Sequence, residues 1–361
     1  MRKRLKERVN VWLLVMGERV GNRKKREWYL SRTGFILPVL ITAIASCSEA
    51  PPPRHIKGTT MGTYYTVAYR ADIDVKKIKS GIEETLYDIE AQLSNWDNES
   101  WISRFNRKQS TGFVSIPEHA YQVLEFTLQL ANQTNYALDP TLGKLINLWG
   151  FGPSKVDRPP NSKAIEEALA ETGPEKITLK KTPVRMVKKY ANLQLNLSSV
   201  VKGYAADVLA RKIGQKGITN YFINIGGEIR ASVSSEKDSS WTVAIQKPAV
   251  NSRSSQAYTM TELFKSGLAT SGDYRRFMDN EGRHYPHIID PQTGRPVEND
   301  LASVTIKAPN SMKADGLATA CLVLGLKKAQ VLIAGTPGVE GLFIQRIKQD
   351  QFRAVTTPGW E

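Results

Sequence analysis

The chain contains few cysteines, two in 361 residues, at Cys47 and Cys321. Disulfides therefore cannot be the main support of the fold, which must rest on an apolar core. The sequence also has no zinc-binding signature, no Walker phosphate-binding loop, no nucleophile elbow and no dinucleotide-binding glycine fingerprint. The enzyme classes that those single motifs define are therefore not supported.

No uncharged run has the length of a typical membrane span, but residues 33–46 come near it with fourteen uncharged residues. A helix needs about 20 apolar residues to cross a bilayer, so this run suits a signal peptide better than a permanent anchor. Residues 1–32 precede it with eleven Lys or Arg against three Glu. An uncleaved signal anchor is the alternative, and Met16 is a second candidate start.

Ile44-Ala45-Ser46-Cys47 resembles a bacterial lipobox. We therefore expect residues 1–46 to be a lipoprotein signal peptide, with Cys47 lipidated as the first residue of the mature chain. Residues 47–55 would then form a tether and residues 56–361 the folded domain. This places the protein on the periplasmic side of a bacterial membrane, with the inner membrane favoured. Cys321 lies in an apolar stretch and is expected in the core.

The net charge of +15 is unevenly distributed along the chain. Residues 47–361 hold 39 Lys or Arg against 32 Asp or Glu, so more than half of the excess belongs to the leader. The mature part has no basic stripe interleaved with aromatic residues, and nucleic acid is not an expected partner.

Hydrophobic periodicity predicts a mixture of helices and strands without regular βα alternation, which favours an α+β fold in one large domain. Apolar steps of three and four predict helices over 74–93, 117–134, 163–172, 199–217 and 311–325. Alternating or β-branched runs predict strands at 63–69, 221–225, 241–246, 257–263, 285–289 and 302–308, and a hairpin over 341–356.

Several short polar blocks could carry chemistry, although each has an ordinary structural reading. Met61 lies in a Gly- and Thr-rich turn, and Trp96 lies in a polar loop where it could stack on a planar ring or simply pack. Ser199 is placed to cap a helix. His287 could accept a proton near neutral pH, and Asp315 with Thr319 shares a helical face that suits Mg²⁺.

Taken together, the blocks resemble the ApbE family of flavin transferases, in the family's order. They include G-T-T-M-G-T, L-S-N-W, L-D-P-T-L-G, L-S-S-V-V-K-G-Y-A-A-D, N-I-G-G-E, H-I-I-D-P-Q-T-G-R-P and A-D-G-L-A-T-A. The resemblance implies FAD contacts at Met61, Trp96, Ala137, Leu138, Asp139, Asn196, Lys202 and the backbone near Ile289. It implies Mg²⁺ ligands at Ser199, Asp315 and Thr319, and a catalytic base at His287.

The activity implied by the resemblance is Mg²⁺-dependent transfer of FMN from FAD to a threonine of a target flavoprotein, with release of AMP. Acceptors would resemble subunits of Na⁺-translocating NADH:quinone reductase or of Rnf complexes. The alternatives are an FAD diphosphatase and a flavin-binding lipoprotein without catalysis. Two positions depart from the family pattern, since Asn196 and Ala318 stand where other members have Asp.

Overall fold

A computed structural model describes residues 52–154, 156, 158–234, 240–248, 256–274, 276–348 and 351–360. Cys47 and the expected signal peptide lie outside these residues. The first strand begins at Arg54, so the expected domain boundary at residue 56 falls inside it.

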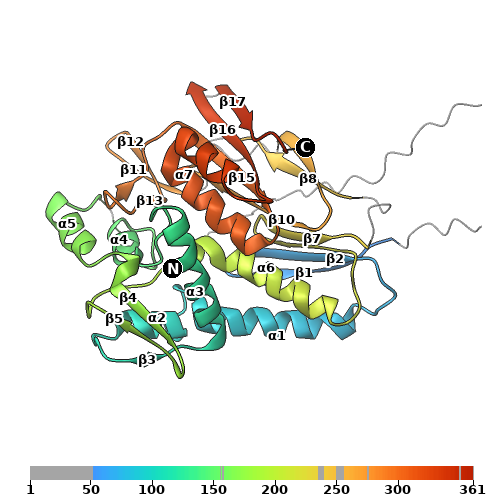
Figure 1. The fold of residues 1–361 in the computed structure, drawn as a ribbon, viewed down its shortest axis with the longest axis horizontal. Coiled ribbons are helices and arrows are strands. Elements are labelled where there is room, and N and C mark those ends of the chain that lie inside the picture. The colour runs from blue at the N-terminus through green and yellow to red at the C-terminus, as the bar shows by residue number, and fades with distance from the viewer. Residues whose placement is uncertain are drawn as a thin grey trace, which may run out of the picture.

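The architecture is an antiparallel sheet with helices packed against it, as an α+β fold requires (Figure 1). In the described part of the chain this sheet has eight strands. Their spatial order is β1 (Arg54–Thr60), β2 (Thr63–Tyr69), β6 (Tyr221–Ile225), β7 (Glu228–Ser232), β10 (Ser266–Gly272), β15 (Leu301–Ala308), β16 (Glu340–Lys348) and β17 (Gln351–Thr356). Every pair within it is antiparallel, which excludes a doubly wound parallel sheet.

The helices cover mainly one face of this sheet, where α6 packs on β6 and β7 and α7 packs on β10 and β15. The helices are α1 (Lys76–Leu93), α2 (Trp101–Arg107), α3 (Glu118–Gln133), α4 (Gly143–Leu148), α5 (Ser162–Ala170), α6 (Ser198–Gly214) and α7 (Ser311–Ala334), with a short 3₁₀ turn at Pro174–Lys176. Helices α1 and α3 pack against α6 and form a further layer.

The other face of the sheet is partly covered by the hairpin of β8 (Trp241–Gln246) and β9 (Ala257–Leu263). Strand β6 shows the consequence, since all five of its residues are buried. Side chains alternate between the faces of a strand, so Ile223 joins the helix-side core and Phe222 packs with Trp241 beneath the hairpin.

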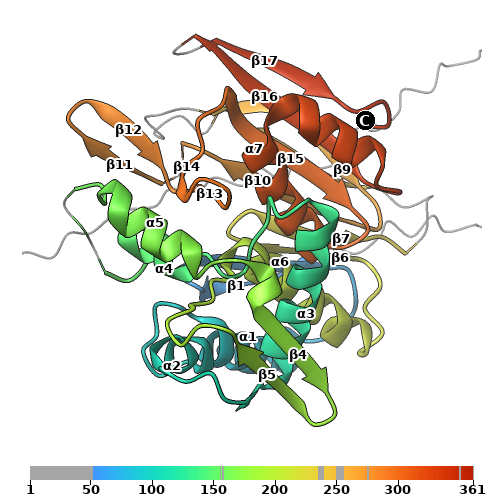
Figure 2. The ribbon, with the colours of Figure 1, turned by 60° about the vertical axis from the view of Figure 1, so that its left-hand side comes forward.

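Smaller sheets surround this centre (Figure 2). They consist of β3 (Val114–Ser115), β5 (Val184–Lys188) and β4 (Ile177–Lys181); of β11 (Phe277–Asn280) and β12 (Arg283–Pro286); and of β13 (Ile289–Asp290) and β14 (Arg295–Pro296). The last two hairpins lie beside α4 and α5, where Ile289, Tyr285 and Trp149 share one apolar cluster. The single strand expected over 285–289 is therefore wrong, because the chain leaves β12 at Pro286 before β13 starts.

Helix α7 continues beyond the predicted end at residue 325. Gly325 has a φ of 72° and a ψ of 166°, so it interrupts the helix where the prediction stopped, and a second helical stretch runs on to Ala334. Within the described residues, α7 is the one helix long and apolar enough to cross a membrane. Its residues up to Leu322 are mostly buried against β10, β15 and α6, whereas Val331 in the second stretch is 75% exposed.

Candidate functional site

Several turns and strand ends meet at one end of the eight-stranded sheet. The register pairs the start of β2 with the end of β6, and the start of β7 with the end of β6. Met61 occupies the β1–β2 turn at a φ of 49°, and its N–H donates to the Glu90 carboxylate of α1. In the neighbouring turn, Gly226 N–H donates to the Tyr64 carbonyl at 3.0 Å. The structure therefore brings the G-T-T-M-G-T and N-I-G-G-E blocks side by side.

Helices α6 and α7 are joined by buried hydrogen bonds that fix their register. Both oxygens of Asp207 accept main-chain N–H groups at the start of α7, from Ser311 at 3.0 Å and Met312 at 2.9 Å. One turn earlier in α6, Gly203 N–H donates to Asp315 Oδ2 at 3.0 Å. Burial raises the pKa of Asp207. Asp207 thus positions α7, a role that the sequence analysis did not assign to it.

Extending this register by one turn places Ser199 level with Thr319, because the helices run in opposite directions and each turn spans 3.6 residues. Thr319 Oγ1 lies 3.1 Å from the hydroxyl of Ser271, the penultimate residue of β10, and 3.3 Å from the Asp315 carbonyl. Asp315, Thr319 and Ser271 therefore lie together, and Ser271 adds an oxygen that the sequence did not indicate. The place of Ser199 beside them follows from the helix register alone and stays a prediction.

The oxygens at this place suit Mg²⁺ better than a transition metal. Asp315 provides a carboxylate that is 4% exposed, and Thr319 and Ser271 provide hydroxyls, with no nitrogen or sulfur among them. Within the described residues, no group of three or more His, Cys, Asp and Glu side chains is arranged to hold a metal. A Mg²⁺ site does not need such a cluster, because the ion binds through one or two carboxylates and takes its other ligands from water and phosphate.

The segment before α6 corrects the expected helix cap. The helix begins at Ser198 and its N-cap position is Leu197, so Ser199 is not the cap. Instead, Asn196 Oδ1 accepts from both the N–H and the hydroxyl of Ser198, at 3.1 and 2.6 Å. The Asn196 N–H donates to the Pro140 carbonyl at 2.8 Å, which ties this segment to the 137–141 block.

The Ala137–Asp139 segment is almost wholly buried. Asp139 Oδ1 accepts from the N–H and the hydroxyl of Thr141, at 2.7 and 2.6 Å. Burial outweighs these bonds and raises the pKa of Asp139 to about 6. Asp139 is therefore held in place by local bonds, and its charge is costly at neutral pH.

Lys202 lies on α6 and pairs with Glu228, the first residue of β7, at 2.5 Å. Glu228 is 2% exposed, and its second carboxylate oxygen has no hydrogen-bond partner among the described residues. A buried carboxylate is costly unless it is paired, so Lys202 and Glu228 hold one another at this end of the sheet.

Trp96 is 60% exposed, which contradicts simple packing. The guanidinium of Arg276 lies over its ring, 5.0 Å from the centroid. Beside it, Asn95 Nδ2 donates to the Leu195 carbonyl at 3.2 Å, so the Trp96 loop also adjoins the segment that leads to Asn196.

His287 lies between β12 and β13, and its ring nitrogen Nδ1 is 3.0 Å from the Arg276 carbonyl. A carbonyl can only accept, so Nδ1 carries the hydrogen and Nε2 is the nitrogen that can take a proton. The ring stands edge-on to Phe151, with centroids 6.3 Å apart. His284 instead bonds Asp279 at 2.8 Å and lies on Phe277, exposed on the β11–β12 hairpin. The two histidines thus have different neighbours, although the single strand expected to place them on opposite faces is not formed.

Ile289 pairs with Pro296 across β13 and β14, and its side chain is 3% exposed. Trp149 Nε1 donates to the Gly294 carbonyl at 2.9 Å, which fixes this turn to the end of α4. The side chain of Ile289 is therefore buried, and the expected contact of its backbone with FAD stays a prediction.

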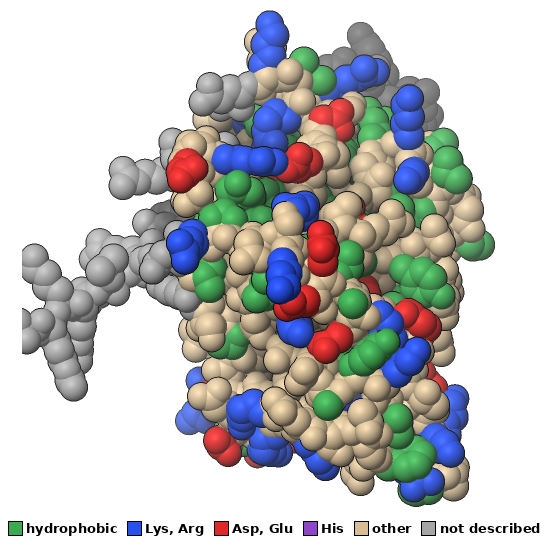
Figure 3. Space-filling model, turned by 90° about the vertical axis from the view of Figure 1, so that its left-hand side faces the viewer, with side chains coloured by type: hydrophobic (Ala, Val, Ile, Leu, Met, Phe, Trp, Pro, Cys, Tyr) green, Lys and Arg blue, Asp and Glu red, His purple; other side chains and the backbone are tan. Residues whose placement is uncertain are grey.

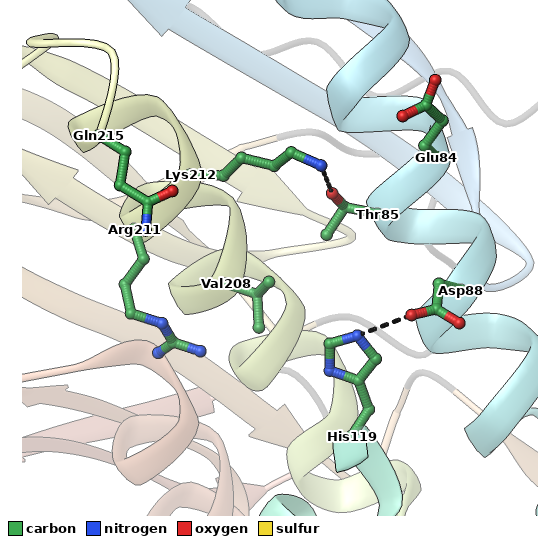
Figure 4. Close-up of a pocket in the computed structure, with 8 residues that line it drawn as sticks. All are labelled: Glu84, Thr85, Asp88, His119, Val208, Arg211, Lys212 and Gln215. Carbon is green, nitrogen blue, oxygen red and sulfur yellow. Dashed lines mark hydrogen bonds and ion pairs between the residues drawn. The ribbon is translucent and has the colours of Figure 1, made fainter. Parts of the chain in front are cut away.

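A concavity lies elsewhere, between α1, α3 and α6, and has a volume of about 490 Å³ (Figure 4). Four of its polar side chains pair with one another: Lys212 donates to Thr85 at 2.7 Å, and His119 pairs with Asp88 at 3.1 Å. From Ser199 to Arg211, which lines it, α6 rises about 18 Å. This cavity is distinct from the predicted site.

On the face shown in Figure 3, basic and acidic side chains are interspersed and form no continuous basic stripe. The expectation that nucleic acid is not a partner stays a prediction.

Comparison with known proteins supports the assignment of the blocks. The description of the matching family is ApbE family, and its model matches residues 61–343. An FAD:protein FMN transferase of Vibrio cholerae is 35% identical over 314 residues, covering 85% of this chain and 90% of that protein. The Haemophilus influenzae protein of the same name is 36% identical over 305 residues, covering 82% and 88%.

Solved structures agree with the fold. The flavin transferase ApbE from Vibrio cholerae superposes with a TM-score of 0.76 at 34% identity, covering 85% of this chain and 98% of that one. The apo form of Pseudomonas stutzeri flavinyl transferase ApbE gives the same TM-score and identity, with 85% and 95% covered. Fold and site thus define an α+β protein of the flavin-transferase architecture. The chain belongs to the ApbE family.

Proposed function

We propose that this protein transfers FMN from FAD to a threonine hydroxyl of an acceptor flavoprotein and releases AMP. The observation that carries the proposal is the placement of His287. Its Nδ1 faces a main-chain carbonyl and its Nε2 can take a proton, and the same Arg276 that holds it covers the exposed Trp96. The names of the relatives in Vibrio and Haemophilus support the same activity.

In this proposal the threonine oxygen attacks the phosphorus on the flavin side of the diphosphate. A bond forms between that oxygen and phosphorus, and the bond from phosphorus to the bridging oxygen breaks. AMP leaves with the electron pair, and the threonine proton moves to Nε2 of His287. General-base assistance of this kind is worth about 10²- to 10⁴-fold in rate.

We assign Mg²⁺ to the oxygens of Asp315, Thr319 and Ser199, with Ser271 beside them. When bound, the ion would neutralise part of the diphosphate charge. The remaining FAD contacts fall to Met61, Trp96, the 137–139 segment, Asn196, Lys202 and the backbone at Ile289. Asn196 and Ala318 reduce the negative charge here relative to the family pattern, which would weaken the binding of a divalent cation.

The acceptors in this proposal resemble subunits of Na⁺-translocating NADH:quinone reductase or Rnf complexes. The protein would meet them on the periplasmic side of the inner membrane, anchored through lipidated Cys47. Changing Cys47 to Ala should move the protein from the membrane fraction to the soluble fraction or leave it unprocessed. A soluble wild type whose N-terminus is not Cys47 would contradict the anchor.

The activity is tested by incubating the purified protein with FAD, Mg²⁺ and a candidate acceptor, then weighing the acceptor by mass spectrometry. The expected result is a mass increase of one FMN group together with free AMP. An acceptor with the target threonine changed to Val is the control and should stay unlabelled. Release of FMN and AMP without labelling would indicate a diphosphatase, and FAD binding without turnover would indicate a carrier.

A further inference from the structure

Arg276 contacts two residues of the candidate site: its backbone carbonyl contacts His287 and its guanidinium contacts Trp96. Its carbonyl accepts from both the main-chain N–H of His287, at 3.1 Å, and the ring nitrogen Nδ1, at 3.0 Å. Its guanidinium lies over Trp96, 180 residues earlier in the chain. The positive charge of Arg276 therefore lies on a side chain whose own backbone carbonyl contacts the proposed base.

The guanidinium has no carboxylate partner among the described residues. The acidic residues nearest to it in sequence are already engaged. Asp273 forms a bidentate pair with Arg346, at 2.7 and 2.9 Å, and Asp279 bonds His284. Arg276 is exposed at the surface, and the partial desolvation of its guanidinium lowers its pKa. A guanidinium in such a place suits an anion that is not part of the protein.

Trp96 and Arg276 are too close to hold a planar ring between them. Two stacked groups need about 3.5 Å of separation on each side of an inserted ring, or about 7 Å in all, against the 5.0 Å observed. A ring that stacks on this face of Trp96 must displace the guanidinium. A cation–π contact at an exposed site is weak, so displacement is easy.

We propose that Arg276 binds the diphosphate of the FAD substrate, and that it leaves Trp96 to do so when a planar ring of the nucleotide stacks there. The inference rests on the proposed function in taking FAD as the ligand. The stacking of the ring and the binding of the phosphate are then coupled through one side chain. FAD gains both contacts, whereas a ligand that has only a ring or only a phosphate gains one.

The position of Arg276 along the chain agrees with this role. Ser271, whose hydroxyl lies 3.1 Å from Thr319 Oγ1, is five residues earlier. The segment from Ser271 to His287 therefore carries a hydroxyl at the proposed metal site, the arginine and the proposed base.

The test compares binding of four ligands to the full mature chain by fluorescence or calorimetry: FAD, ADP, riboflavin and adenosine. Charge-assisted hydrogen bonds contribute about 1.5–3 kcal/mol, which is roughly 10- to 100-fold in affinity. Arg276→Gln is expected to weaken FAD and ADP by that factor and to change riboflavin and adenosine less than about 3-fold. Arg276→Lys, which keeps the charge but not the planar fork, should give an intermediate loss.

Arg283→Gln is the matched control, because Arg283 also lies over an aromatic ring, that of Tyr285 at 5.2 Å, but is paired with Glu298. This change should leave all four affinities unaltered. Equal weakening of all four ligands by Arg276→Gln would show a structural role and overturn the inference, as would unchanged ADP binding.

The binding assay also separates this inference from the proposed activity. If Arg276→Gln weakens ADP binding but the wild type transfers no FMN, the inference stands and the proposed activity is refuted. Normal FMN transfer with ADP binding that is independent of Arg276 would do the reverse.

Discussion

Gly203 donates its main-chain N–H to the carboxylate of Asp315, at 3.0 Å across the interface between α6 and α7. The bond is buried and joins residues 112 apart in sequence. It fixes the carboxylate that we assign to Mg²⁺, and it exists only because the two helices approach each other closely at Gly203.

The close approach predicts that Gly203→Ala destabilises the fold. An added Cβ would lie 2.4 Å from the Ser311 carbonyl oxygen and 2.8 Å from Met312 Cα, which are backbone atoms that cannot turn aside. Overpacking of this kind costs roughly 1–3 kcal/mol. Denaturant unfolding should show that loss. Gly214→Ala, in the same helix and with nothing within 4 Å of its Cβ, is the control and should be neutral or slightly stabilising.

The metal assignment predicts that Asp315→Asn abolishes Mg²⁺-dependent transfer while the protein stays folded. The amide oxygen can still accept from Gly203 N–H, but the negative charge is gone. The rate at limiting Mg²⁺ should fall on the order of 10²-fold or more, since a catalytic metal supplies several kcal/mol of charge stabilisation. Thr319→Val should cost less because a neutral hydroxyl is a weaker ligand. Wild-type rates for Asp315→Asn at limiting Mg²⁺, with an unchanged unfolding midpoint, would rule out the assignment.

The base assignment predicts that His287→Ala slows FMN transfer by roughly 10²- to 10⁴-fold at saturating FAD and keeps FAD affinity within a few fold. His284→Ala should behave like wild type, since His284 is exposed and bonds only within its own hairpin. Trp96→Ala should give the opposite split, with weaker FAD binding and a smaller change in rate. Single-turnover kinetics and FAD titrations measure both quantities. A dead His284→Ala beside an active His287→Ala would show that the wrong histidine has been chosen.

Asp139 predicts a pH-dependent contribution to stability. Its pKa is raised from 3.8 to about 6 by burial, so the folded state binds the proton more tightly than the unfolded state. Its contribution is therefore most favourable below pH 4 and is lost as pH rises through 6, a difference of about 3 kcal/mol. Asp139→Asn keeps an acceptor for Thr141 but does not titrate.

The free energies of unfolding of wild type and Asp139→Asn, measured without FAD at pH 4 and pH 7, test this sign. Relative to the wild type, the stability of the variant should rise by about 2–2.5 kcal/mol from pH 4 to pH 7. A constant difference between the two proteins across this range would show that Asp139 does not carry the shift.

The sequence alone determined the elements whose apolar pattern is strong. The β-branched run of β2 and the three- and four-residue steps of α1 were predicted within two residues, because one face of each is buried along its whole length. Strand β10 was missed, since S-G-L-A-T-S-G has two glycines and no apolar alternation. Ser271 was missed for the same reason, because no local sequence pattern indicates that it lies beside Thr319.

The candidate residues were also readable from the sequence, but only as separate blocks. Which of them meet was decided by tertiary structure: Asp207 accepts the first N–H group of a helix 104 residues later in the chain, and Asn196, not Ser199, bonds the start of α6. Arg276 belongs to no recognised block, and its importance appears only where the fold lays it between Trp96 and His287. Local patterns record which face of an element is buried. They carry no information on the long-range packing of α6 on α7, or of the 271–287 segment on the Trp96 loop, which brings the site together.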